Sequence, residues 1–191
     1  HRKAPILAHP AQCLEVNGIH DRVGMDLVFG FPETVEGYKG ILVITEYLSK
    51  YPMAFPIKSK TALEISNHLL EYLAIFGPPG QILSDQGKEF VNTVVSQLSE
   101  VTGIERTLTS AYHPRTNGMT ERFNQTLVEC LAKHAERDPL AWPRWIPYVL
   151  MAYRSRQHSS TGLSPFEVMF GRRMRTFDEA PRSPVTNPED D

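Results

Sequence analysis

The chain has 191 residues, 41% of them apolar, which is enough for one well-buried domain at a typical size of about 100–200 residues. Its two cysteines, Cys13 and Cys130, form no C-x-x-C pair, which argues against a disulfide scaffold or a thiolate zinc site and suits a reducing compartment. The net charge of −2 excludes a polycation, and no apolar run reaches the roughly 18 residues of a membrane span, so we expect a soluble intracellular protein.

Three parts are expected along the chain. Residues 1–21 contain prolines and no regular pattern, and we expect an N-terminal arm or linker there. Residues 22–175 should form the domain itself, and the acidic residues 176–191 a linker or tail. The first residue is His1 rather than Met, so we expect a fragment of a longer polypeptide.

The apolar pattern predicts strands and helices in a definite order. Apolar, β-branched segments typical of strands lie at residues 22–30, 40–49, 53–59, 81–87 and 104–110. Segments with the spacing of helices lie at residues 61–76, 90–103, 117–136, 142–159 and 164–171. At the start of the first helix, Thr61 and Glu64 have the spacing of a capping box.

This order predicts the sheet. Three strands joined by short turns should form an antiparallel meander, with Pro56 marking its third strand as an edge. The two later strands are separated by helices and should join as parallel crossovers. We therefore expect an α/β fold with a mixed five-stranded sheet, three strands antiparallel and two parallel, flanked by helices.

The charge is unevenly distributed. Residues 113–175 contain ten Lys or Arg and five Asp or Glu, whereas residues 176–191 contain one Arg and five acids. A locally basic half could lie against phosphates, and an ordinary mixed-charge surface explains the count equally well.

Three acidic residues stand out by position. Asp26 lies within an apolar strand, where a charge is costly unless it is paired or holds a cation. Asp85 ends the fourth predicted strand, the end of a βα unit at which ligands bind. At 100° per residue, Glu121 points about 140° from the apolar stripe of its helix, so it should project from the helix start.

Each acid also has an ordinary explanation: an ion pair for Asp26, turn formation for Asp85, and the helix dipole for Glu121. Together they favour a shared site, because adjacent first and fourth strands would bring Asp26 and Asp85 side by side. Carboxylates that converge repel one another, and divalent metal relieves the repulsion. Oxygen ligands without His or Cys select Mg²⁺ or Mn²⁺, and two such ions can clamp a phosphoryl displacement.

Four motifs along the chain resemble a known family, the catalytic core of retroviral-type integrases, and most of all those of gypsy-class LTR retrotransposons. The resemblance extends from about Arg22 to Arg175. Its motifs are "GMDLVFG", "ILSDQGKEF", "AYHPRTNGMTERFNQTL" and "STGLSPFEVMFGRR". The family requires thirty-five residues between its second Asp and its Glu, and residues 86 to 120 meet that requirement.

The resemblance implies a ribonuclease H-like fold and a catalytic, metal-binding triad of Asp26, Asp85 and Glu121 that holds two Mg²⁺ or Mn²⁺ ions. It implies 3′-end processing of retroelement DNA by water, followed by strand transfer into target DNA. Candidate contacts to nucleic acid lie beside the triad and in the loop before Glu121: Lys88, His113, Arg115, Asn117 and Gln125. Some members of the family carry lysines where this chain has Gln125 and Val128.

The family also implies partners. These are retroelement DNA ends, target DNA and further copies of the chain in a homodimer or larger oligomer, acting in the nucleus and with no membrane. An N-terminal zinc module and a small C-terminal domain are expected in the full-length protein. Two other hypotheses remain: a host-domesticated relic that binds DNA or protein without catalysis, and a nuclease of the same fold that cuts RNA–DNA hybrids.

Overall fold

The structure is a computed structural model that describes residues 18–103, 109–111, 118–159 and 161–175. For residues 109–111 and 118–121 it describes the backbone alone. Within the described part, no helix combines the length and the apolar character that crossing a bilayer requires.

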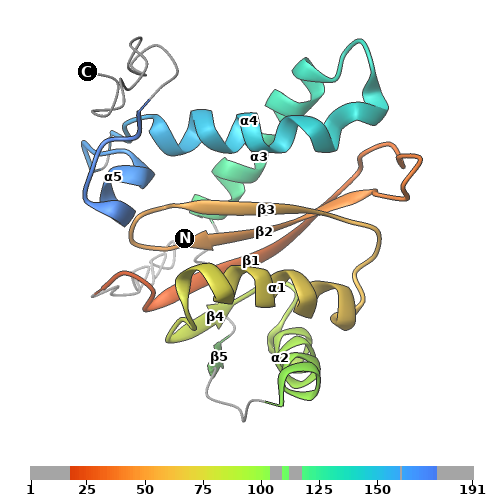
Figure 1. The fold of residues 1–191 in the computed structure, drawn as a ribbon, viewed down its shortest axis with the longest axis vertical. Helices are drawn as coiled ribbons and strands as arrows, with labels where there is room; N and C mark the ends of the chain where they lie inside the picture. The colour runs from red at the N-terminus through yellow and green to blue at the C-terminus, as the bar shows by residue number, and fades with distance from the viewer. Residues whose placement is uncertain (1–17, 104–108, 112–117, 160, 176–191) are drawn as a thin grey trace, which may run out of the picture.

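A mixed β-sheet forms the centre of the molecule (Figure 1). Its strands, in chain order, are β1 (Arg22–Phe29), β2 (Gly40–Glu46), β3 (Pro52–Ile57), β4 (Gln81–Leu83) and β5 (Thr109–Ala111). In space the order is β3-β2-β1-β4-β5, with β1, β2 and β3 antiparallel and β4 and β5 parallel to β1. The mixed sheet is therefore as predicted, and β3, which contains Pro56, lies at an edge.

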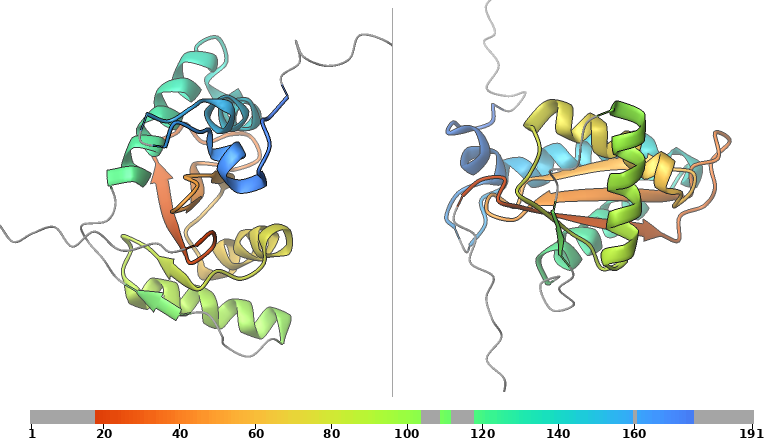
Figure 2. Two further views of the ribbon diagram at one scale, coloured as in Figure 1. Left: turned by 90° about the vertical axis from the view of Figure 1, so that its left-hand side faces the viewer. Right: turned by 90° about the horizontal axis from the view of Figure 1, so that it is seen from below.

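Helices cover both faces of the sheet (Figures 1 and 2). They are α1 (Ala62–Phe76), α2 (Lys88–Thr102), α3 (Gly118–His134), α4 (Trp142–Ser155) and α5 (Pro165–Phe170), with a short 3-10 turn at Pro139–Ala141 before α4. One apolar core joins the sheet to α1 and α2, and a second joins it to α3 and α4. The predicted helix 142–159 is shorter in the structure, because Arg156 has an extended backbone with ψ 133°.

Successive side chains of a strand point to opposite faces of the sheet, so neighbouring residues belong to different cores. In β2, Leu42 and Ile44 belong to the core under α1 and α2, and Ile41 and Val43 belong to the opposite core. The same alternation in β1 places Met25 in the core under α1 and α2. Its neighbour Asp26 therefore faces the side of α3 and α4, a placement that decides the geometry of the candidate site.

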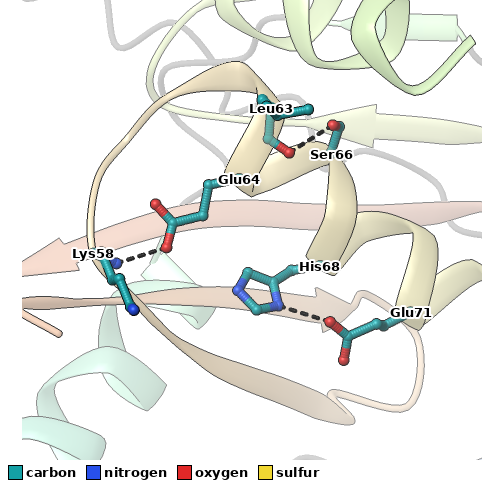
Figure 3. A network of polar contacts seen from close by, with 6 residues as sticks. All are labelled: Lys58, Leu63, Glu64, Ser66, His68 and Glu71. Carbon is teal, nitrogen blue, oxygen red and sulfur yellow. Dashed lines mark hydrogen bonds and ion pairs between the residues drawn. The ribbon is translucent and has the colours of Figure 1, made fainter. Parts of the chain in front are cut away.

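The start of α1 differs from the predicted capping box. Thr61 Oγ1 accepts a hydrogen bond from Glu64 N at 3.4 Å. The Glu64 carboxylate accepts instead from Lys58 N at 2.7 Å (Figure 3). It also accepts from Ser59 N at 2.8 Å. Burial raises the pKa of Glu64, and the hydrogen bonds from Lys58 and Ser59 outweigh burial and lower it overall. A complete capping box forms at α5, between Ser164 and Glu167.

Candidate active site

Asp26 is a buried carboxylate in the centre of β1, with 4% of its surface exposed. A charge at this depth is tolerated only where polar groups or a cation compensate for lost hydration. Asn124, on α3, donates a hydrogen bond from Nδ2 to Asp26 Oδ2 at 3.3 Å. This contact places α3 beside the middle of β1.

Asp85 follows β4 rather than ending it, because the strand stops at Leu83 and the predicted strand 81–87 is too long. The parallel register pairs Gly24 with Leu83. Asp26 and Asp85 each lie two residues beyond this last pair, in β1 and in the turn after β4. Asp85 is exposed, and its Oδ1 accepts a hydrogen bond from Gln86 Nε2 at 3.2 Å.

Glu121 lies in the first turn of α3, which agrees with the predicted helix. Its side chain lies outside the described residues. It precedes Asn124 by three positions, and residues three apart in a helix share one face. The Asn124 contact therefore shows that the N-terminal part of α3, which includes the backbone of Glu121, lies near β1.

The donor chemistry fits a divalent ion. Asn124 Oδ1 is buried and has no hydrogen-bond partner among the described residues, so an oxygen atom beside Asp26 lacks a donor or cation. Carboxylate and amide oxygens are the ligands that Mg²⁺ prefers. Among the side chains that the structure describes, no group of three or more His, Cys, Asp or Glu gathers to hold a metal, and the Glu121 side chain is not among them.

The predicted contacts to nucleic acid are only partly described. Lys88 is exposed in the first turn of α2, directly after the Gly87 cap. Gln125 is exposed on α3, where its Nε2 donates to Glu129 Oε1 at 2.9 Å. His113, Arg115 and Asn117 lie outside the described residues.

Sequence reasoning missed Asn124. The signal that could have found it is its position three residues after Glu121, the spacing that places two side chains on one helical face. Trp142, whose size and apolar character would also suit an interface, is a core residue with 1% exposure, and its Nε1 donates to Pro32 O at 2.9 Å.

A known protein family matches the part of the chain that contains Asp26 and Asp85. The family model described as integrase core domain matches residues 19–114, half of the chain, including Asp26 and Asp85. The chain belongs to the integrase core domain family. Glu121 lies beyond the matched residues.

Individual integrase relatives agree with this assignment. The chain is 37% identical over 136 residues to the Gag-Pol polyprotein of avian reticuloendotheliosis virus, covering 71% of this chain and 12% of that polyprotein. It is 28% identical over 153 residues to the retrovirus-related Pol polyprotein from transposon 412 of Drosophila melanogaster. That match covers 80% of this chain and 12% of the polyprotein. This integrase core thus spans about a tenth of the curated relatives' length.

A solved integrase core has the same fold. The catalytic core domain of HTLV-2 integrase, determined in complex with magnesium in a trimeric form, superimposes with a TM-score of 0.61 at 18% identity. The match covers 78% of this chain and 95% of that one. At this identity the likeness shows the fold, which is the ribonuclease H-like fold expected for integrase cores.

Proposed function

We propose that this integrase core is a polynucleotidyl transferase that processes the 3′ ends of retroelement DNA and joins them to target DNA in the nucleus. The observation that carries the proposal is the position of β1, which contacts both β4, the strand before Asp85, and α3, the helix that contains Glu121. β4 pairs with β1 up to Leu83, two residues before Asp85, and Asn124 on α3 donates a hydrogen bond to Asp26.

Asp26, Asp85 and Glu121 would hold the metal, which we propose is a pair of Mg²⁺ or Mn²⁺ ions. The metal would supply charge neutralisation to a phosphate under in-line attack. In the first reaction water attacks a phosphodiester and a 3′ hydroxyl is released. In the second, that hydroxyl attacks a target phosphodiester, and one P–O bond forms as another breaks.

In this proposal the side chains of the protein hold the metal in place and form no covalent bond to the DNA. Asp26 is fixed by the buried strand and by Asn124, so we assign Asn124 as a positioning residue. Asp85 lies in the turn after β4 and Glu121 in the first turn of α3. We further propose that the integrase acts as a homo-oligomer on retroelement and target DNA, with a zinc module and a C-terminal domain elsewhere in the polypeptide.

Metal binding should stabilise the protein against heat. At a metal concentration about tenfold above Kd, binding to the folded state contributes about 1.4 kcal/mol, or roughly 3–6 °C in Tm for a domain of this size. Asp85→Asn should remove this increase. Without metal it should melt at the wild-type temperature or higher, because one repelling charge is gone.

The measurement is differential scanning fluorimetry with Mg²⁺, with Mn²⁺ and with EDTA. Glu100→Gln is the matched control, because Glu100 is an exposed acid on α2, and it should keep the full increase. A wild-type Tm that does not change with either metal would count against the proposed site.

A further inference from the structure

A second polar feature, which we call the basic cleft, lies on α3 away from Asp26. It has a volume of about 580 Å³. It is lined by Lys50, Arg122, Thr126, Tyr153, Arg156, Gln157, His158 and Ser159. Three of these side chains are cationic at neutral pH, a fourth is an imidazole, and none of the described residues that line the cleft is acidic.

The basic cleft is assembled from segments far apart in sequence. Lys50 comes from the β2–β3 turn, Arg122 from the first turns of α3, and Arg156 from the chain just after α4. In a protein of net charge −2, this gathering of positive charge is a local feature of the fold. Such a concentration attracts anions, and it does so most strongly at low ionic strength.

The wall of the cleft is held in place by aromatic packing. The ring of Tyr153 packs edge-to-face against the rings of buried Phe123 and of His158. The ring centroids are 4.6 Å and 4.9 Å apart, respectively. The backbone oxygen of His158 accepts hydrogen bonds from Thr161 N at 3.2 Å and Gly162 N at 2.8 Å. The imidazole is therefore positioned before any ligand arrives.

The surroundings of His158 are strongly positive. Burial lowers the pKa of the His158 imidazole, and the charges of Lys50 and Arg156 lower it further. These two cations are therefore close enough to act on the same side chain. A bound anion would relieve the repulsion between them.

Lys50 adds an independent observation. Its φ is 61°, in the left-handed region that glycine adopts freely and that a residue with a Cβ adopts at a cost. Glycine would suit this turn better, so the backbone alone does not explain a lysine there. The same lysine lines the basic cleft.

We propose that the basic cleft binds the phosphodiester backbone of DNA next to the reacting phosphate. The inference rests on the proposed function, because DNA is the substrate it assumes. On the helical wheel, Arg122 and Thr126 lie across α3 from Asn124, and the width of a helix is about 10 Å. A DNA strand that passes the first turns of α3 would therefore run close to both the reacting site and the cleft.

The test is fluorescence anisotropy with a fluorescein-labelled DNA duplex in EDTA, from about 50 to about 200 mM KCl. Lys50→Gly and Arg156→Gln should each weaken binding severalfold. The double variant should lower the slope of log K against log salt by about 2, one unit for each lost phosphate contact. Lys50→Gly should keep or raise Tm, which separates lost binding from lost folding.

Arg144→Gln is the matched control, because Arg144 is an exposed arginine on α4 about 18 Å from Arg156 along the helix axis. It should bind DNA as the wild type does. Wild-type affinity and slope in the double variant would overturn the proposal, and so would wild-type protein that binds no DNA at the lowest salt. Metal-dependent Tm measured in the same variants reports on the acidic site alone, so a failure of either proposal can be recognised separately.

Discussion

Glu121→Gln should strongly reduce the DNA strand transfer proposed for this integrase core while leaving the fold intact. The substitution keeps the size of the side chain and removes one of three negative charges proposed to hold the metal. Loss of a preorganised group that stabilises developing charge typically lowers a rate by about 10²–10³-fold, and loss of a metal ligand should reach the upper end. We expect a decrease on the order of 10³-fold.

The assay is disintegration of a branched DNA substrate, the reverse of strand transfer, with Mg²⁺ or Mn²⁺. Glu136→Gln is the control, since Glu136 is an exposed acid just past the opposite end of α3, and it should retain wild-type activity. Circular dichroism and Tm in EDTA should be unchanged in both variants. Activity that survives in Glu121→Gln would point to a contaminating nuclease or to a mechanism without this residue.

Glu46→Ala should strongly destabilise the fold. Glu46 is fully buried at the end of β2, with four hydrogen bonds to its carboxylate. His20 N and Leu48 N donate to Oε1 at 3.1 Å each, and Ser49 donates to Oε2 from N at 2.6 Å and from Oγ at 2.5 Å. Removing the carboxylate leaves several of these donors buried without a partner, at roughly 3–5 kcal/mol in total.

Urea unfolding measures this cost. The midpoint should fall while the m-value stays constant, because the surface exposed on unfolding hardly changes. Glu71→Ala is the matched control, because Glu71 is a largely exposed acid on α1 paired with His68 at 3.0 Å, and it should cost less than about 0.5 kcal/mol. A Glu46→Ala midpoint equal to that of Glu71→Ala would show that the buried network contributes little.

Glu46 also shows how a buried acid can be structural. It pairs with Val23, three residues before Asp26 on β1, which is about 10 Å along a strand. Its carboxylate is satisfied by backbone and hydroxyl donors of the adjoining turn and of His20. Asp26, by contrast, lies beside an amide oxygen with no described partner, the environment expected of a site that takes a cation.

The sequence predicted the parts of this site that follow from strand order. An antiparallel hairpin followed by a crossover puts the first and fourth strands together, so Asp26 and the turn that contains Asp85 belong to neighbouring strands. Period-2 alternation then decides the face on which Asp26 lies. These features depend on local patterns, which a sequence records directly.

Other features depend on contacts between distant segments and could not be predicted. Asn124 and Asp26 are hydrogen-bonded although they are 98 residues apart in sequence. The basic cleft is likewise lined by residues of three separate segments: the β2–β3 turn, α3 and the chain after α4. Glu64 has the spacing of a capping box, yet its carboxylate accepts from Lys58 N and Ser59 N of the β3–α1 turn, and Thr61 N donates to Ser59 Oγ instead. Spacing alone does not determine which of two donors a carboxylate accepts from.

Asp26, Asp85 and Glu121, from three separate elements, are proposed to share divalent metal. Anomalous diffraction from crystals soaked in Mn²⁺ tests this proposal most directly. We predict at least one manganese peak between Asp26 and Asp85, with the Glu121 carboxylate within about 2.0–2.6 Å of a peak, the range for oxygen ligands of hard cations. Manganese bound with the Glu121 carboxylate beyond coordination distance, or no peak at Asp26 and Asp85, would contradict the account.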